Sequence, residues 1–159
     1  MGAVAAGSAP ILNVDLIAEL GVSRQEVSAA VAKERAEVDR RENLYRAGQP
    51  APDLRGRVVI VVDDGLATGS TMLAAARHLR TLSPAKLIIA VPVGSSETCQ
   101  LLKREADKVV CLASPALFRA VGAWFQDFHQ ITDAEVRRLL QENRRQTGAM
   151  KAIDFPASQ

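Results

Sequence analysis

Cysteine, histidine and aromatic residues are all scarce in this chain. Two cysteines and two histidines among 159 residues cannot build a disulfide framework, and their spacing matches no structural zinc motif. Lys and Arg total 20 against 18 Asp and Glu, so the net charge of +2 offers no basic surface for nucleic acid or for a membrane. We therefore expect a reduced, cytoplasmic protein that binds neither nucleic acid nor membranes.

Long apolar runs are absent as well. The longest covers residues 87–93 and contains Pro92, which is far short of the roughly 20 residues that a membrane-spanning helix needs. The N-terminus also lacks the basic segment of a signal peptide. A length of 159 residues with 48% apolar composition instead suits one globular domain that folds without a disulfide or a structural metal.

Apolar segments and turn signals alternate along the chain and predict strands that alternate with helices. A capping box at Ser23 and Glu26 starts a helix that ends near residue 46, and the sequence Thr132 to Glu135 caps a last helix that ends near residue 145. Other expected elements are a strand or hairpin in residues 1–12, strands at 58–62, 87–93 and 108–112, and helices after Gly69 and over 97–106. Such strands, apolar on both faces, predict a parallel sheet in a three-layer α/β/α domain.

The segment that follows the strand at 58–62 combines carboxylates, glycines and hydroxyls. Asp63 and Asp64 stand at the carboxyl end of that strand, where open parallel sheets bind their ligands. Carboxylates at this place suit sugar hydroxyls or a hydrated magnesium ion. The residues expected to hold a phosphate are Ala67, Thr68, Gly69, Ser70 and Thr71. They offer hydroxyls and the free amides of a helix N-terminus, so we predict a site for a ribose 5-phosphate group.

Other ligand loops fit this segment less well. A Walker loop needs a lysine after the last glycine, and Ser70 follows Gly69 here. The spacing of Gly65 and Gly69 also departs from the dinucleotide fingerprint. A phospho-receiver domain would need an Asp and a Lys at the ends of other strands, whereas Asp107 and Lys108 stand at the beginning of theirs.

Residues 59–71 closely resemble the phosphoribosyl-pyrophosphate signature of the type I phosphoribosyltransferases. The departure is Gly65, where Val, Ile or Ser is more usual. The resemblance to bacterial members extends through residues 34–46, 90–93 and 120–128, and it covers the chain from about residue 2 to residue 145. It implies the fold of that family, magnesium as cofactor, phosphoribosyl pyrophosphate or ribose 5-phosphate as ligand, and transfer of the phosphoribosyl group to a nitrogen base.

The resemblance also implies a role for each matching residue. Asp63 and Asp64 would be the catalytic carboxylates that bind the ribose hydroxyls directly or through magnesium, and residues 67–71 would cradle the 5-phosphate. Asp127 would be a further magnesium ligand, and Trp124 or Phe125 would stack on the base. The alternative for the aromatic residues, that they only pack under the C-terminal helix, stays open.

The same resemblance implies a domain at residues 1–145 and a polar tail at 146–159. Its parts would be a capped helix and loop (13–57), a strand–helix core (58–112) and a hood-like segment (113–130). No strand and pyrophosphate loop of the type I kind precede residue 58, so we expect an N-terminally incomplete fold. Its open sheet edge would be covered by a partner such as a second copy, or the chain would be part of a longer product. Two functions therefore stay open: a transferase completed by another chain, and a non-catalytic or truncated phosphoribosyl-binding module.

Overall fold

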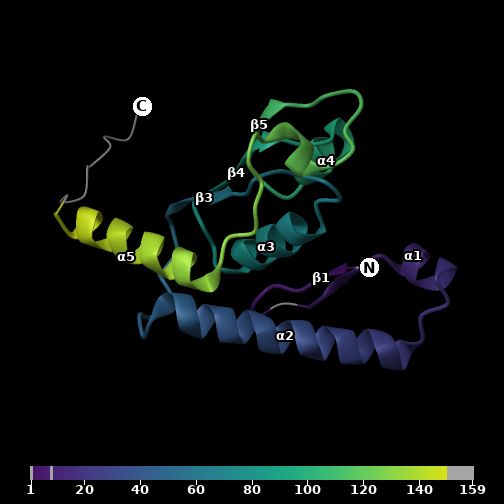
Figure 1. Ribbon diagram of the computed structural model, residues 1–159, viewed down its shortest axis with the longest axis horizontal. Helices are drawn as coiled ribbons and strands as arrows, with labels where there is room; N and C mark the ends of the chain where they lie inside the picture. The colour runs from purple at the N-terminus through teal and green to yellow at the C-terminus, as the bar shows by residue number, and fades with distance from the viewer. Residues whose placement is uncertain (1, 8, 150–159) are drawn as a thin grey trace.

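The computed structural model describes residues 2–7 and 9–149 (Figure 1). Its centre is a parallel sheet of three strands in chain order: β3 (Val58–Val62), β4 (Lys86–Val93) and β5 (Lys108–Ala113). In the middle of this sheet Val61 pairs with Ile89, which pairs with Val109 on its other side. The expected α/β class with a parallel sheet is confirmed, and the three strands lie within one residue of the predicted boundaries.

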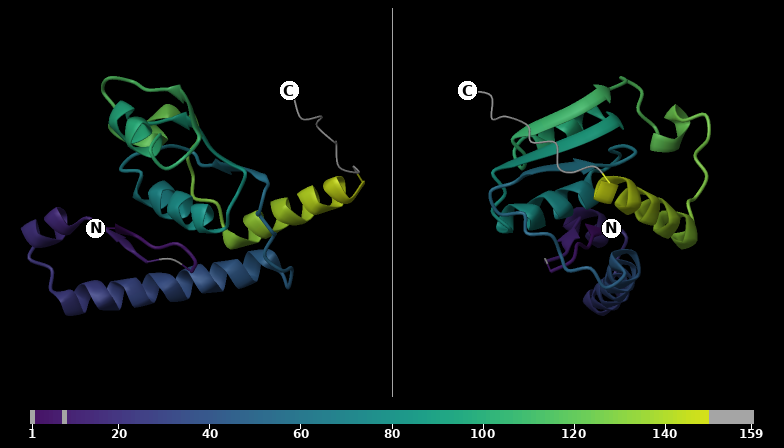
Figure 2. Two further views of the ribbon diagram at one scale, coloured as in Figure 1. Left: turned by 180° about the vertical axis from the view of Figure 1, so that it is seen from behind. Right: turned by 90° about the vertical axis from the view of Figure 1, so that its left-hand side faces the viewer.

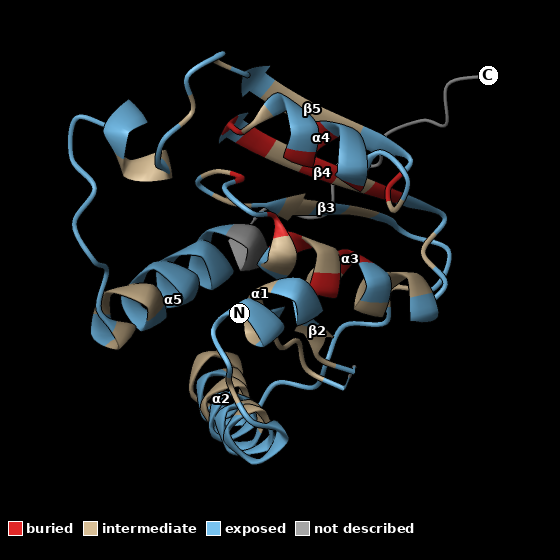
Figure 3. Cartoon of the chain, turned by 90° about the vertical axis from the view of Figure 1, so that its right-hand side faces the viewer, coloured by how far each residue is buried: buried red, intermediate tan, exposed pale blue. Residues whose placement is uncertain are grey.

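Helices α3 (Ser70–Thr81) and α4 (Ser96–Leu102) connect the strands and cover one face of the sheet. Crossovers between neighbouring parallel strands are almost always right-handed. Because β3, β4 and β5 follow each other in one direction across the sheet, the two helices lie on the same face. Leu87 and Ile89 of β4 point into this layer and are fully buried against Ala76 of α3 and Leu102 of α4. Figure 3 shows the buried residues concentrated in β4, α3 and α4.

The opposite face of the sheet is open. Val58, Ile60 and Val62 of β3 alternate with the inward residues and keep 59–72% of their surface exposed, and Leu112 of β5 keeps 80%. Within the described residues, β3 is an edge strand and no helix covers this face, so they form only one of the two helical layers of a three-layer fold.

The N-terminal part forms a hairpin and two helices beside α3. Strands β1 (Gly2–Ala3) and β2 (Ile11–Leu12) pair antiparallel, which confirms the expected hairpin. Helix α1 (Val14–Glu19) and the long helix α2 (Arg24–Arg46) follow. Figures 1 and 2 show the hairpin between α2 and α3.

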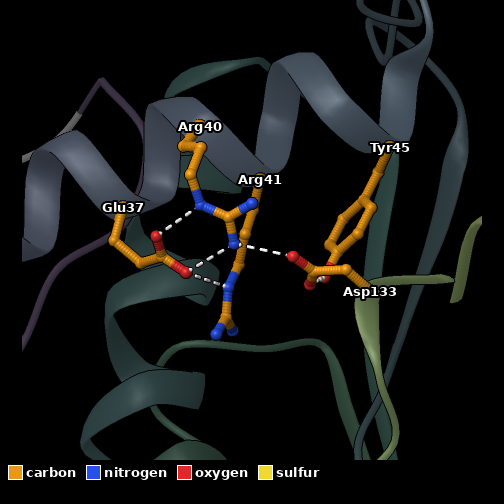
Figure 4. Close-up of polar contacts among 5 residues, drawn as sticks. All are labelled: Glu37, Arg40, Arg41, Tyr45 and Asp133. Atoms are coloured by element: carbon orange, nitrogen blue, oxygen red, sulfur yellow. Dashed lines mark hydrogen bonds and ion pairs between the residues drawn. The ribbon is translucent and has the colours of Figure 1, made fainter.

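Helix α5 (Asp133–Ala149) packs against the C-terminal part of α2 through polar contacts (Figure 4). The Tyr45 hydroxyl donates a 2.5 Å hydrogen bond to one oxygen of Asp133, and Arg40 donates a 2.8 Å bond to the other. Arg40 and the neighbouring Arg41 also bond Glu37, and these contacts lower the pKa of Glu37 to about 2. The contacts tie the two helices together at an exposed surface.

The described helices include none that is both long enough and apolar enough to cross a membrane. Helix α5 continues to Ala149, past the predicted end near residue 145, so the first part of the expected polar tail is helical. The rest of that tail, 150–159, lies outside the described residues.

Candidate functional site

The acidic pair follows β3 directly at the carboxyl end of the sheet. The amide of Asp64 donates a 2.9 Å hydrogen bond to Oδ1 of Asp63. Burial raises the pKa of Asp63 above its usual value, and the adjacent charge of Asp64 adds to the effect. Asp64 remains exposed. The pair therefore places two carboxylates next to each other, one half-buried and one open to a ligand.

Leu66 anchors the loop that follows the carboxylates. Its side chain is 1% exposed, and its backbone forms a bridge to Gly94 at the end of β4. The amide of Leu66 donates to the Val93 carbonyl at 2.9 Å, and its carbonyl accepts from the amide of Ser95 at 3.1 Å. The loop is thus fixed at its base, while Ala67 and Thr68 beyond it are exposed.

The loop ends at the N-terminus of α3, where no side chain caps the helix. Gly69 is the N-cap residue and has a φ of 70°, a conformation that favours glycine. Side chains cap the first turns of the other four described α-helices, through Asn13 in α1, Ser23 in α2, Ser95 in α4 and Thr132 in α5. The first-turn amides of α3 are left for a ligand, and the helix dipole there favours an anion.

Thr98 of α4 supports the loop at residues 67–71. Its hydroxyl donates a 2.8 Å hydrogen bond to the carbonyl of Ala67, and its methyl group lies against Gly69. A Cβ at position 69 would lie only 2.4 Å from Thr98 Cγ2, so no side chain fits there without a shift. Within the same loop, the hydroxyls of Thr68 and Ser70 lie 3.3 Å apart. Thr98, which no local sequence pattern marks, therefore supports the residues that are predicted to bind the phosphate.

The hood-like segment packs onto the acidic loop through the 3-10 helix η1 (Val121–Trp124). A Cβ at Gly65 would lie 2.7 Å from Val121 Cγ1, so the glycine provides the space that Val121 fills. In the same way Gly122 accommodates the ring of Phe128, which lies 5.2 Å from the ring of Phe125. Two glycines thus allow the aromatic segment to approach the carboxylates.

A cavity of about 560 Å³ lies between the acidic loop and the aromatic segment. Asp64 lines one part of it. The other lining residues are Phe125, Asp127, Phe128, His129, Gln130 and Ile131. Asp127 accepts hydrogen bonds from the amide of His129 at 3.2 Å and pairs with its Nδ1 at 2.9 Å.

Comparison with known proteins identifies the family of this fold and site. The family model described as the phosphoribosyl transferase domain matches residues 3–126. The chain belongs to the phosphoribosyl transferase domain family. The match spans the hairpin, α2, the sheet, the acidic loop and the 3-10 helix.

Relatives of this phosphoribosyl transferase domain include two curated proteins and one solved structure. Two Mycobacterium tuberculosis proteins (strains CDC 1551 / Oshkosh and ATCC 25618 / H37Rv), both named "Putative phosphoribosyl transferase", are 36% identical over 156 residues. That alignment includes 98% of this chain, and the chain spans about a third (35%) of the length of these relatives. The crystal structure of TT1426 from Thermus thermophilus is 35% identical, with a TM-score of 0.69, over 89% of this chain and 66% of that one.

Within the phosphoribosyl transferase domain, the predicted site residues are only partly brought together. Phe125 and Asp127 line the cavity with Asp64, whereas Trp124 is not among its lining residues. Phe128 and His129 were not predicted as site residues, although they directly follow the predicted segment. Their place in the cavity depends on the packing of Phe128 onto Gly122.

The donor set of this phosphoribosyl transferase domain suits a magnesium ion that is shared with a substrate. In residues 2–7 and 9–149, no group of three or more His, Cys, Asp or Glu side chains is arranged to hold a metal ion. Magnesium often binds through only one or two carboxylates together with substrate phosphates and water. Asp63 and Asp64 fit that mode, and the assignment of Asp127 to the metal stays a prediction.

Proposed function

We propose that this domain binds phosphoribosyl pyrophosphate with magnesium and transfers the phosphoribosyl group to a nitrogen base. The observation that carries the proposal is the uncapped N-terminus of α3, which follows the acidic pair after a loop of only a few residues. A phosphate fits the helix N-terminus because the free amides and the helix dipole both favour an anion. The carboxylates beside it are then placed for the sugar that carries the phosphate.

Each part of the loop has its own task in this proposal. Residues 67–71 bind the 5-phosphate through their backbone amides and through the hydroxyls of Thr68, Ser70 and Thr71. Asp63 and Asp64 accept hydrogen bonds from the ribose 2- and 3-hydroxyls. Thr98 holds the loop in shape through the Ala67 carbonyl, so that little ordering is needed when the ligand binds.

Magnesium, held by Asp63 and Asp64, would neutralise negative charge on the pyrophosphate leaving group. The carboxylates have a second role in the transfer itself. A nitrogen of the base forms a bond to the anomeric carbon and gives up its proton to water, while the bond to pyrophosphate breaks and its electron pair leaves with the pyrophosphate. Positive charge develops on the sugar as this bond breaks, and the fixed carboxylates of Asp63 and Asp64 beside the ribose stabilise this charge.

The cavity beside Asp64 is the proposed place of the nitrogen base. Its volume of about 560 Å³ accommodates a flat heterocycle, and Phe125 and Phe128 offer aromatic surfaces for stacking. The cavity lies next to Asp64, so a base in it is close to a ribose held by the carboxylates. Trp124, half exposed, would contribute only at the margin of this cavity.

The second candidate function is a non-catalytic module that binds a phosphoribosyl group. It is supported by the open edge of β3, because the described residues pair no strand with β3 on the side away from β4. The site for the pyrophosphate would then be incomplete within this chain. The expectation that a second copy covers this edge stays a prediction.

Calorimetric titration with two ligands distinguishes the candidates. In the presence of magnesium, a transferase site binds phosphoribosyl pyrophosphate more tightly than ribose 5-phosphate, whereas a phosphoribosyl-binding module binds the two equally. Release of pyrophosphate on addition of a nucleobase from a panel of purines and pyrimidines then identifies the acceptor. Binding of neither ligand would contradict both candidates.

Two variants test the site assignment. Asp64→Asn and Thr68→Val should each weaken binding by about tenfold or more, which corresponds to about 1.4 kcal/mol. Asp39→Asn on α2 and Thr81→Val at the far end of α3 are the matched controls, because they make the same chemical changes away from the loop. Equal affinities in the site and control variants would refute the assignment.

A further inference from the structure

The two cysteines of the chain face one glycine from two different elements. Cys99 belongs to α4 and Cys111 to β5. A Cβ at Gly94 would lie 3.1 Å from the sulfur of Cys99 and 3.5 Å from the sulfur of Cys111. Both thiols are free, and the missing side chain at Gly94 leaves a space that the two sulfur atoms share.

Both thiols also lie near one polar side chain. The hydroxyl of Ser114 lies 3.4 Å from the sulfur of Cys111 and 4.0 Å from that of Cys99. The Cys111 thiol also donates a 3.2 Å hydrogen bond to the carbonyl of Ala113. Burial raises the pKa of the Cys99 thiol above its usual value, and the neighbouring Cys111 raises it further. Cys99 is 7% exposed while Cys111 is only half-buried, so Cys111 is the thiol that a small oxidant reaches first.

The first turn of α4 connects this thiol pair to the phosphate loop. Thr98, the residue before Cys99, hydrogen-bonds the carbonyl of Ala67 and lies against Gly69. A displacement of Cys99 toward β5 therefore moves a residue that supports the loop.

We propose that Cys99 and Cys111 are a redox-sensitive pair. A peroxide converts the two thiols to a disulfide, and formation of this disulfide loosens the loop at residues 67–71. A disulfide bond is about 2.05 Å long, so the two sulfur atoms must approach each other to form it. This approach draws Cys99 toward β5 and weakens the contact between Thr98 and Ala67. The disulfide itself does not depend on the proposed function, whereas its effect on phosphate binding rests on that function.

The reaction balances with one peroxide molecule. The sulfur of Cys111 attacks one peroxide oxygen, the O–O bond breaks, and water leaves as Cys111 becomes a sulfenic acid. The sulfur of Cys99 then attacks the sulfur of Cys111, the S–O bond breaks, and the hydroxyl leaves as a second water with the proton of Cys99. The two thiols lose two electrons in total, and the peroxide accepts them.

Intact-mass measurement tests the disulfide. After treatment with hydrogen peroxide, the protein should lose about 2 Da, corresponding to two hydrogen atoms, and should no longer react with N-ethylmaleimide after denaturation. Trypsin should release one linked pair of peptides, because Lys103, Arg104 and Lys108 separate the two cysteines. Two thiols that still react after peroxide treatment, or a disulfide that joins two chains, would overturn the proposal.

Single variants assign the order of the two steps. In Cys99→Ser the sulfenic acid at Cys111 has no partner, so it should accumulate and form an adduct with dimedone. In Cys111→Ser the buried Cys99 should stay a free thiol under the same treatment. A dimedone adduct on Cys99 and none on Cys111 would contradict the assigned order.

Hydrogen exchange tests the connection to the loop without any ligand. The amides that are hydrogen-bonded at the two ends of the loop, Leu66 to the Val93 carbonyl and Leu73 to the Gly69 carbonyl, should exchange about threefold or more faster in the oxidised protein than in the reduced one, and dithiothreitol should reverse the change. Titration with ribose 5-phosphate is done in parallel and should show weaker binding after oxidation. Unchanged exchange of the Leu66 and Leu73 amides in the disulfide form refutes the connection, whereas failure of the reduced protein to bind ribose 5-phosphate refutes the proposed function instead.

Discussion

Val121 packs directly against Gly65, in the space that a side chain at position 65 would occupy. A Cβ at position 65 would lie 2.7 Å and 2.9 Å from the two methyl carbons of Val121, and 2.9 Å from the carbonyl oxygen of Val93. The residue that departs from the family signature is thus the one that receives the 3-10 helix. Through this contact the aromatic segment is held beside Asp64.

Gly65→Val should therefore destabilise the domain and displace the aromatic segment. The added side chain would overpack the contact, which costs about 1–3 kcal/mol in free energy of unfolding. Urea unfolding measures this cost. The double variant Gly65→Val with Val121→Ala should recover part of the loss, since it removes the methyl groups but leaves the Val93 carbonyl in place. Additive effects of the two substitutions would contradict the packing argument.

Gly69→Ala should cost more stability than Gly56→Ala. Both glycines have a φ of 70°, so alanine pays the same conformational penalty of about 1–2 kcal/mol at each. A Cβ at Gly56 meets nothing within 4 Å, whereas a Cβ at Gly69 lies 2.4 Å from Thr98 Cγ2. We expect an additional cost of about 1–3 kcal/mol at position 69, measured by urea unfolding, together with loss of ribose 5-phosphate binding.

Thr98→Ser provides the control for that comparison. Serine keeps the hydroxyl that bonds the Ala67 carbonyl and removes the methyl group that opposes a side chain at position 69. Combined with Gly69→Ala, it should restore much of the additional loss. If the double variant is as unstable as Gly69→Ala alone, contact with Thr98 is not the cause.

Local patterns in the sequence were sufficient for much of the fold. The β-branched run at 58–62 and the capping boxes at Ser23 and Thr132 involve residues close in sequence, and the structure has these elements where they were predicted. The 3-10 helix at Val121–Trp124 was not predicted, because it depends on Gly65 far away in the chain.

Contacts between distant residues also explain two further differences. Helix α4 ends at Leu102, before the predicted end at 106, and in the turns beyond it Glu105 bonds Arg77 through its side chain and Arg80 through its carbonyl. Thr98 reaches Ala67 across 31 positions, so its role in the candidate site left no local pattern. The candidate site at 63–71 could be proposed from the sequence because one short segment contains both carboxylates and the residues that are expected to hold a phosphate.

Asp63→Asn should raise stability at neutral pH while it weakens ligand binding. Burial raises the pKa of Asp63 in the folded state above the usual 3.8, so the fold favours the protonated carboxyl. Ionised Asp63 therefore costs stability, and this cost appears as the pH rises through the raised pKa. Asparagine removes the charge and still accepts the amide of Asp64. In thermal unfolding, the melting temperature of the variant should exceed that of the wild type at pH 7 but not at pH 3.

The matched control for Asp63→Asn is Asp39→Asn, which removes a carboxylate from the exposed surface of α2. It should neither raise the melting temperature at pH 7 nor change the binding of phosphoribosyl pyrophosphate with magnesium. A gain in stability for Asp63→Asn that persists at pH 3 would show that charge burial is not its origin.

The attachment of α5 to α2 should weaken at acid pH. The hydrogen bond from the Tyr45 hydroxyl has the largest effect on Asp133 and, together with that from Arg40, holds its pKa below the usual 3.8. The ionised carboxylate therefore supports the contact between α5 and α2 at neutral pH. This support is lost as the pH falls below 3.8 and through the lowered pKa, because the protonated group no longer attracts Arg40. The protection factors of the α5 amides, which are corrected for the intrinsic pH dependence of exchange, should therefore fall in wild type over that interval, and in Asp133→Asn they should be low at every pH. Glu142→Gln, which breaks the pair with Arg138 inside α5, should leave the contact with α2 intact. Equal exchange in Asp133→Asn and wild type at pH 7 would show that Asp133 does not hold the two helices together.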